Sequence, residues 1–369
     1  EIKTLEDQNV NIWNGKEFSN VKIIKTGENQ KLIKVNFSNG ESIECTPYHR
    51  FVIQKNYNKK PLIVEAKDLK PDMKIFKYNL PIIDNLTEDI KYPYTNGFFS
   101  ADGTFYDKKE EIKQCEYKII KNNLCGHHQQ FKNIESCCIT EMNGKCIAKT
   151  KLKRGKIDLY GDKRLLIPFI DKREGSDILE YEKIITVSMP LDISDKYTVP
   201  INASIKNKLD WFAGLCDGDG CTSTFEGYTL IQISSIHLEF LKNVRLMLTT
   251  LGINPKISVL REESDKMMPD GNGGQKLYPC QKCYRLLLSS GHVNQLNELG
   301  FKTHRLDTTT VNPKREVTKY IKITNIEDNN RFDDTYCFNE PKLHQGIFNG
   351  ILTMNCSEVI LHTSSEEIA

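Results

Sequence analysis

Alternation of apolar and polar residues dominates the first 80 positions of the chain and predicts short β-strands. β-Branched residues alternate or cluster over 20–25, 31–37 and 42–45, which is the pattern of strands with one buried face. The run Ser38-Asn39-Gly40 has the composition of a hairpin turn. We therefore expect a β-rich domain over residues 1–83.

Longer apolar periods begin near residue 84 and predict helices mixed with strands. Residues 228–234 alternate like a strand, and 238–252 carry apolar residues at helical spacing up to Gly252, which is typical of a helix end. Strand-like alternation returns at 320–324. The chain is thus expected to hold an α/β segment over 84–312, followed by a second β-rich segment over 313–355.

One nine-residue pattern occurs twice in the α/β segment. It reads Thr-Asn-Gly-Phe-Phe-Ser-Ala-Asp-Gly at 95–103 and Phe-Ala-Gly-Leu-Cys-Asp-Gly-Asp-Gly at 212–220. In each copy two small residues stand four positions apart on one helix face, where they let two helices approach closely. These residues are Gly97 and Ala101 in the first copy, and Gly214 and Gly218 in the second. Such a helix pair would place Asp102 beside Asp219 at the C-terminal ends.

Paired carboxylates at Asp102 and Asp219 predict a metal site. Two adjacent negative charges repel unless a cation lies between them, and Mg²⁺ prefers oxygen ligands and substrate phosphates. We expect both residues to be catalytic and to bind Mg²⁺. The alternative is that each Asp is a turn residue beside a helix-capping glycine. Repetition of the whole pattern favours the metal site.

The repeated pattern resembles the LAGLIDADG, or dodecapeptide, motif of homing endonucleases. The second copy matches at Ala213, Gly214, Leu215, Asp217, Asp219 and Gly220, and the first shares Gly97, Ala101, Asp102 and Gly103. The resemblance implies a two-repeat αββαββα domain that hydrolyses two phosphodiester bonds of double-stranded DNA. It also implies one catalytic lysine in each half, at Lys196, which is displaced by one residue, and at Lys302.

Basic residues alternate with others along 146–156 and predict a DNA contact. Lys149, Lys151, Lys153 and Arg154 lie in this run, which is expected to form a strand after the first motif. A row of cations beside a carboxylate pair would follow DNA phosphates. The alternative is an ordinary solvated strand face.

Composition restricts the possible partners. The net charge is only +2, so a nucleic-acid surface must be a local patch. No run approaches the roughly 18 apolar residues of a membrane span, and the first residues are not a signal peptide. We therefore expect an intracellular, cytoplasmic monomer with access to DNA and no membrane partner. The 12 cysteines then predict reduced thiols rather than disulfides.

The pair Asn355-Cys356 carries a second kind of chemistry. An Asn side-chain amide can attack its own backbone carbonyl and break the following bond, and a Cys thiolate can accept an acyl group. The preceding residues resemble the C-terminal splicing blocks of inteins, at Tyr336, Phe338, His344, Gly350, Ile351, Leu352, Asn355 and Cys356. Met354 stands where most inteins have a His that assists Asn cyclisation, and Cys337 where many have an Asp. His344 is the natural substitute for the missing His.

A second intein block occurs near the start of the chain. The run from Gly40 through Thr46 and His49 resembles the Thr-x-x-His block that polarises the N-terminal splice bond, and 66–76 resembles the next strand. A lone His would more often be a core residue on a strand. Together the blocks imply the all-β Hint fold of inteins, divided in sequence by the endonuclease and re-formed in space.

The ends of the chain complete this interpretation. No splicing nucleophile stands at Glu1, so we expect that the sequence begins inside the intein. Residues 356–369 resemble the active-site segment of class I ribonucleotide reductase large subunits and are expected to be C-extein. Cys356 would then be first the splicing nucleophile and later a catalytic residue of the host. The expected DNA substrate is the intein-free host gene.

Two other functions are open on the sequence. The first motif is degenerate, so the domain could be a splicing element with a decayed endonuclease. Cysteines and histidines at 115–146, with Cys280 and Cys283, could instead support a zinc-stabilised nucleic-acid-binding module, although their spacing fits no common zinc site.

Overall fold

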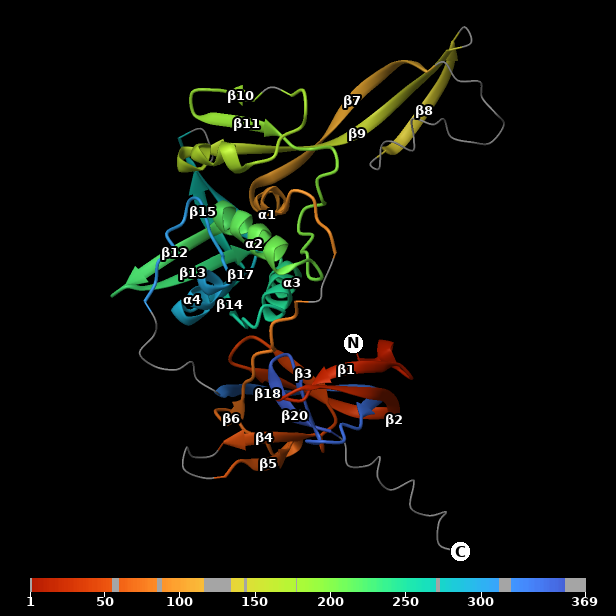
Figure 1. The fold of residues 1–369 in the computed structure, drawn as a ribbon, viewed down its shortest axis with the longest axis vertical. Coiled ribbons are helices and arrows are strands. Elements are labelled where there is room, and N and C mark those ends of the chain that lie inside the picture. The colour runs from red at the N-terminus through yellow and green to blue at the C-terminus, as the bar shows by residue number, and fades with distance from the viewer. Residues whose placement is uncertain are drawn as a thin grey trace, which may run out of the picture. The chain divides into compact units, whose positions relative to one another are not determined.

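The chain is described here by a computed structural model, shown in Figure 1. Backbone is described for 2–54, 60–84, 88–115, 134–142, 145–176, 178–269, 273–311 and 320–355, and side chains for these residues except 107–115, 134–142 and 145–153. The chain divides into two compact units. Unit 1 comprises 1–83, 235–292 and 312–369, and unit 2 comprises 84–234 and 293–311.

Unit 1 is built on a nine-stranded antiparallel sheet with the order β1-β2-β18-β6-β4-β20-β19, to which β3 adds beside β2 and β5 beside β4. Its strands come from both ends of the sequence: β1 (Asn9–Trp13), β2 (Phe18–Phe37), β3 (Ser42–Cys45), β4 (Arg50–Gln54), β5 (Leu62–Glu65), β6 (Lys74–Phe76), β18 (Tyr320–Phe338), β19 (Gln345–Phe348) and β20 (Ile351–Met354).

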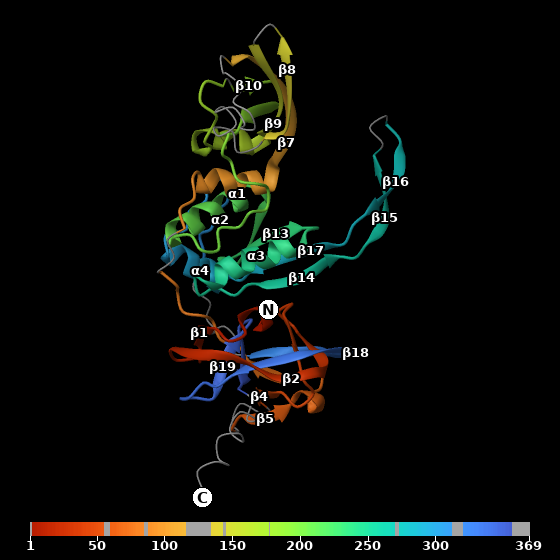
Figure 2. The same ribbon diagram turned by 90° about the vertical axis from the view of Figure 1, so that its right-hand side faces the viewer.

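The long strands β2 and β18 join the two ends of the chain. Their register runs from Phe37 opposite Ile323 to Ile23 opposite Phe338, and the two strands lie side by side in Figures 1 and 2. The prediction that the β-rich segments re-form one structure in space is confirmed. The predicted strands at 20–25 and 31–37 are, however, a single strand, because β18 pairs with the polar residues between them.

The core of the sheet mixes residues from both segments. Val35, Phe51 and Ile75 come from before the α/β segment and Ile351 from after it, and all four are fully buried in one cluster. Burial of apolar surface is the main stabilising term in folding, so neither segment alone would complete this core.

The predicted turn at Ser38-Asn39-Gly40 is confirmed. The Gly40 N–H donates to the Phe37 carbonyl at 3.0 Å, and Gly40 has a φ of +85°, a conformation that favours glycine. A Cβ at Gly40 would lie 2.3 Å from the carbonyl oxygen of Ile257. The turn is therefore packed against the later part of unit 1.

That later part consists of one helix and two antiparallel strand pairs: α3 (Leu238–Thr249), β14 (Lys256–Arg261) with β17 (Cys283–Leu288), and β15 (Ser264–Pro269) with β16 (Gln275–Cys280). In Figure 2, β15 and β16 continue outward from β14 and β17. The predicted helix at 238–252 is confirmed, and Gly252 follows it with a φ of +76°.

A buried ion pair joins α3 to the turn. Arg245 Nη2 lies 2.7 Å from Glu41 Oε1, with side chains that are only 5% and 16% exposed. The Ile257 N–H also donates to the Asn39 carbonyl at 3.1 Å. Residues 235–292 thus belong by contacts to unit 1, whereas the sequence-based boundaries group them within 84–312. Those boundaries remain a proposal.

Unit 2 contains two closely packed helices, α1 (Pro93–Asp102) and α2 (Ile205–Asp219). A Cβ at Gly97 would lie 1.8 Å from the carbonyl oxygen of Trp211, and one at Gly214 would lie 1.9 Å from that of Tyr94. The backbones therefore touch at both motif glycines, so the prediction of a close helix pair is confirmed.

Each of these helices leads into strands. After α1 come β7 (Gly103–Cys115), β8 (Ile134–Met142), β9 (Lys145–Tyr160), a 3-10 helix (Gly161–Phe169), β10 (Leu179–Glu180) and β11 (Ile184–Ser188); these strands form a sheet in the order β10-β11-β9-β7, with β8 beside β9. After α2 come the paired strands β12 (Gly220–Phe225) and β13 (Tyr228–Ser235). The later helix α4 spans Ser290–Glu298. In the described part of the chain, every helix is too short or too polar to cross a membrane.

Candidate functional site

The motif carboxylates lie at equivalent positions, Asp102 as the last residue of α1 and Asp219 as the last residue of α2. A Cβ at Gly218 would lie 2.4 Å from the Ala101 Cβ and 3.7 Å from Asp102 Oδ2. The ends of the helices are therefore in contact, and the small residues predicted to allow this do so. This contact brings the two carboxylates to one place in unit 2.

Two lysines accompany the carboxylates. Lys196 Nζ donates to the backbone carbonyls of Ala101 and Gly103, at 3.0 and 2.9 Å. Lys163 Nζ lies 2.6 Å from Asp102 Oδ2. Lys163 belongs to the 3-10 helix Gly161–Phe169, and no motif in the sequence distinguishes it from the other lysines. It is a site residue that sequence analysis missed.

Electrostatics in this cluster favour a cation. Surrounding protein atoms desolvate the Asp219 carboxyl, and the negative charge of Asp102 repels it. Both effects raise the pKa of Asp219, while the positive charges of Lys163, Lys196 and Arg305 lower it. The pKa of Lys196 is lowered by desolvation, although both carboxylates oppose the shift. The two acids thus share one region in which added positive charge is stabilising.

Arg305 supplies a further positive charge beside α2. Its Nε donates to the Asp217 carbonyl at 2.6 Å and its Nη2 to the Gly220 carbonyl at 2.7 Å. Asp217 is fully buried, and its Oδ1 accepts the Arg305 backbone N–H at 2.9 Å. A cation at a helix C-terminus is favourable because the unpaired carbonyls there carry partial negative charge.

Lys302, by contrast, is exposed and has no hydrogen bond or ion pair with either carboxylate among the contacts of the described residues. Arg305, three residues further along the chain, is one of the basic side chains whose positive charge lowers the pKa of Asp219. The prediction that Lys302 lies beside the carboxylates therefore finds no counterpart in the contacts, and its catalytic role stays a prediction.

The N-terminal splicing block lies in unit 1, between β3 and β4. Thr46 and His49 close a turn, in which the His49 N–H donates to the Thr46 carbonyl at 3.0 Å. The His49 ring packs edge-on against Phe51, with centroids 5.2 Å apart. Withdrawal from solvent, followed by the positive charge of Arg50, lowers the pKa of His49 to about 4. The imidazole is therefore neutral near pH 7.

The C-terminal splicing block ends at Asn355, the last described residue. Its backbone N–H donates to the His344 carbonyl at 2.9 Å, and its Nδ2 donates to Asn339 Oδ1 at 3.3 Å. His344 thus contacts Asn355 through its backbone, while its side chain is exposed. Asn339 is a contact that sequence analysis did not single out. Cys356 lies outside the described residues.

Comparison with known protein families matches residues 206–332 to the model described as "LAGLIDADG-like domain". This range begins in α2, whose end carries Asp219, and ends in β18.

Residues 206–332 are thus similar to a LAGLIDADG-like domain.

Curated relatives add a host context. The chain is 38% identical over 381 residues to the ribonucleoside-diphosphate reductase large subunit of Invertebrate iridescent virus 6, an alignment that covers 100% of this chain and 35% of the relative. It is 24% identical over 356 residues to the ribonucleoside-diphosphate reductase NrdEB subunit alpha of Bacillus subtilis (strain 168). That alignment covers 91% of this chain and 31% of the relative. The chain thus spans about a third of the length of these relatives.

Solved structures of homing endonucleases are also similar. I-DmoI in complex with DNA and Ca aligns with 59% of this chain and 92% of its own length, at 13% identity and a TM-score of 0.32. I-GzeII in complex with its DNA target aligns with 58% of this chain and 86% of its own length, at 11% identity and a TM-score of 0.29.

The predicted basic row lies on β9, ahead of the LAGLIDADG-like match. Lys149, Lys151 and Lys153 alternate along the strand and so share one face, but their side chains lie outside the described residues. Arg154 is on the opposite face and is only 8% exposed. Its own burial therefore removes Arg154 from the predicted solvent-facing row. DNA binding by the three lysines stays a prediction.

The cysteines of the zinc hypothesis are only partly described. Cys280 is buried and Cys283 half-buried, both as free thiols. Among the described residues, no group of three or more His, Cys, Asp or Glu side chains could hold a metal ion. The cysteine-rich segment 115–146 falls on residues whose side chains are outside the description.

Replacing Lys163 by methionine is expected to make the stability of unit 2 more dependent on divalent cations. The variant loses the ammonium beside Asp102, so repulsion between Asp102 and Asp219 is no longer offset there. In calorimetric melting without DNA, Mg²⁺ or Ca²⁺ should raise the Tm of Lys163→Met by more than it raises that of the wild type. Lys172→Met is the control. Equal shifts in both proteins would contradict a role for Lys163 as counterion.

His49 is expected to stay neutral down to about pH 4, as its pKa indicates. In an NMR titration its ring should show no inflection near pH 6.5, and His49→Gln assigns the signal. The unfolded chain takes up a proton near pH 6.5 and the folded one only near 4. His49 therefore lowers stability as pH falls from 6.5 towards 4. An inflection at 6 or above would contradict this environment.

Proposed function

We propose that the chain is an intein in a ribonucleotide reductase large subunit, and that its LAGLIDADG-like domain cleaves double-stranded DNA. One observation carries the proposal. A single β-sheet is assembled from the two ends of the chain, holds Thr46, His49 and Asn355, and is interrupted in sequence by a helix pair that ends in two adjacent carboxylates. The domain boundaries 1–83, 84–312, 313–355 and 356–369 belong to the same proposal.

DNA hydrolysis is assigned to the carboxylate cluster of unit 2. Asp102 and Asp219 would hold a divalent cation, with Mg²⁺ favoured by the all-oxygen donor set and by the desolvation and Asp102 repulsion that raise the pKa of Asp219. When bound, this ion would supply charge neutralisation and an activated water. Lys196 and Lys163 would compensate the negative charge of the phosphodiester, and Lys302 is retained as a more distant candidate.

Splicing is assigned to the sheet of unit 1. Thr46 and His49 would polarise the N-terminal scissile bond by hydrogen bonding, since a neutral imidazole can donate one proton and accept another. The Asn355 side-chain nitrogen would attack its own backbone carbonyl and release Cys356, to which the N-extein has been transferred. His344 would assist this step. Cys356 would afterwards serve the reductase, so an unspliced host would be inactive.

The names of the curated relatives support the host assignment. One aligned relative is a reductase large subunit and the other a reductase subunit alpha, and both extend well beyond the region matched by this chain. An insertion of this kind would interrupt the cleavage site in the allele that encodes it. The DNA substrate would then be the intein-free host gene, in which the site is intact.

A cleavage assay tests the endonuclease. The chain is incubated with Mg²⁺ and a plasmid that carries the uninterrupted host gene, alongside Asp219→Asn. The wild type should linearise the plasmid at one site, and the variant should not. Binding without cleavage by the wild type would support the second candidate, a splicing element with a decayed endonuclease, which the exposed position of Lys302 favours. Absence of both binding and cleavage would overturn the DNA-directed function.

A further inference from the structure

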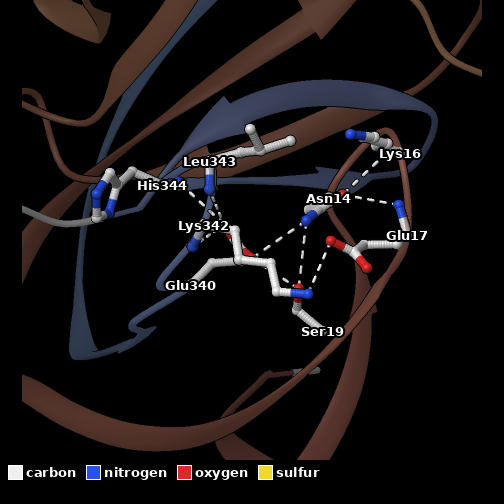
Figure 3. A network of polar contacts seen from close by, with 8 residues as sticks. All are labelled: Asn14, Lys16, Glu17, Ser19, Glu340, Lys342, Leu343 and His344. Carbon is white, nitrogen blue, oxygen red and sulfur yellow. Dashed lines mark hydrogen bonds and ion pairs between the residues drawn. The ribbon is translucent and has the colours of Figure 1, made fainter.

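A fully buried carboxylate, Glu340, lies between the first hairpin of the chain and the turn that precedes β19. Figure 3 shows its polar contacts. On one side, Glu340 Oε1 accepts a hydrogen bond from Ser19 Oγ at 2.6 Å and another from Asn14 Nδ2 at 3.1 Å. Asn14 and Glu340 are both 0% exposed. Burying a charge is costly unless it is well hydrogen-bonded, so these contacts define a built feature of the fold.

On its other side, Glu340 folds the turn that follows it. Oε2 accepts the backbone N–H groups of Lys342, Leu343 and His344, at 3.2, 2.6 and 2.9 Å. His344 has a φ of +55°, which is unfavourable for a residue with a side chain. The bond to its N–H stabilises that conformation. Burial alone would raise the pKa of Glu340, but hydrogen bonds from Ser19, Leu343, Asn14 and Lys342 lower it to about 2.

The folded turn carries both described contacts of Asn355. Asn339, directly before Glu340, accepts the Asn355 Nδ2 hydrogen bond at 3.3 Å. His344, at the far end of the turn, accepts the Asn355 backbone N–H at 2.9 Å. Because Glu340 fixes the residues between these two acceptors, it controls their spacing without touching Asn355.

Hydrogen bonds within the N-terminal hairpin hold Asn14 in place for its contact with Glu340. Asn14 Oδ1 accepts the backbone N–H groups of Lys16 and Glu17, both at 2.9 Å, which leaves its Nδ2 for Glu340 and Ser19. Gln345 Nε2 donates to the Asn14 carbonyl at 2.8 Å. The hairpin therefore contacts both ends of the segment from Glu340 to Gln345.

We propose that Glu340 is a positioning residue for cleavage after Asn355, and that Asn14 and Ser19 couple the N-terminal hairpin to that cleavage. This inference rests on the proposed splicing function. In the step, Asn355 Nδ2 bonds to its own backbone carbonyl carbon, the bond to the Cys356 nitrogen breaks, and one Nδ2 proton passes to the released amine. Asn339 fixes the rotation of the attacking amide. Glu340 takes no proton in this step, because hydrogen bonds occupy both of its oxygens. Met354 occupies the place of the usual assisting His, which leaves orientation of Asn355 to these contacts.

Cleavage of the chain itself tests the proposal. Purified chain is incubated at pH 7, and release of the segment after Asn355 is followed by mass spectrometry, with Asn355→Ala as the blank. Glu340→Gln places an amide N–H against existing donors and should slow release by about 10-fold or more, since small displacements of reacting groups have effects of this order. Ser19→Ala should slow it less, and Glu340→Asp should recover part of the rate.

Loss of stability is separated from loss of positioning by Arg245→Met, which breaks a buried ion pair elsewhere in unit 1. All rates are measured at one temperature, about 15 °C below the lowest Tm of the proteins compared. Slow release in Glu340→Gln with a wild-type rate in Arg245→Met supports the proposal. Equal slowing in both, or a wild-type rate in Glu340→Gln, overturns it while splicing chemistry stands. If the wild type itself releases nothing, the splicing function and this inference fall together.

Discussion

Replacing Gly214 by valine is expected to unfold the helix pair of unit 2 and to abolish DNA cleavage. The new Cβ would lie 1.9 Å from the carbonyl oxygen of Tyr94 and 2.8 Å from the Phe98 nitrogen, and both are backbone atoms that cannot rotate away. Overpacking of this kind costs about 3 kcal/mol or more when neighbours cannot yield. Denaturant unfolding should show the loss of stability, and circular dichroism the loss of helix.

Gly175→Ala is the matched control, because that glycine has no neighbour within 4 Å but a φ of +66°. It isolates the cost of a left-handed backbone, about 1 kcal/mol. A Gly214→Val protein with the stability of this control would show that α1 and α2 do not touch at their glycines.

Replacing Arg245 by methionine is expected to destabilise unit 1 by about 3–5 kcal/mol, the usual cost of leaving one member of a buried ion pair uncompensated. Glu41 keeps its negative charge beside α3, and the Asn39 carbonyl loses a donor at 3.4 Å. Burial already raises the pKa of Glu41, against the opposing charge of Arg245, so the variant should raise it further. Since a raised carboxyl pKa favours the folded state at low pH, the deficit should shrink from pH 7.5 to 5.5.

The control for this variant is Lys67→Met, which removes an ion pair with Glu65 whose side chains are 57% and 38% exposed. Exposed pairs contribute about 0–1 kcal/mol. The double variant Arg245→Met with Glu41→Leu should recover much of the lost stability, because no buried charge is left unpaired. The pair would be uncoupled if the double variant lost as much stability as Arg245→Met and Glu41→Leu lose in sum. That result would contradict the ion pair between α3 and the turn.

Sequence reasoning succeeded where a local pattern has one structural solution. Glycines four residues apart from a small partner require a close helix contact, and this alone placed Asp102 near Asp219. The Asn-Gly turn at Gly40 was predictable for the same reason. The strand β2 was divided in the prediction because apolar alternation stops between 25 and 31, yet β18 pairs with Gly27 and Gln30 in that interval. A partner 300 residues away is not visible in a local pattern.

The missed residues share one property, which is that their role is set by distant contacts. Lys163 differs from other lysines only because the 3-10 helix that carries it begins near Asp102, and Arg305 only because α2 ends beside it. In the sequence, Glu340 cannot be distinguished from an ordinary surface acid. In the fold it is buried and accepts hydrogen bonds from Asn14 and Ser19. Conversely, Lys302 fits a family pattern but its side chain faces solvent, and Arg154 fits a charge pattern but is itself buried.

The pairing of β2 with β18 also dictates an order of events during synthesis. Phe37 of β2 pairs with Ile323 of β18, so nearly 300 residues must be translated after Phe37 before the two strands can meet. At ribosomal rates of 5–20 residues per second, this takes roughly 15 to 60 seconds. The helices of unit 2, which need only nearer neighbours, can form within that interval. Nascent β2 meanwhile keeps an open hydrogen-bonding edge, a state that invites aggregation and that ribosome-bound chaperones recognise. The sheet of unit 1 therefore cannot be completed before its last strands have been translated.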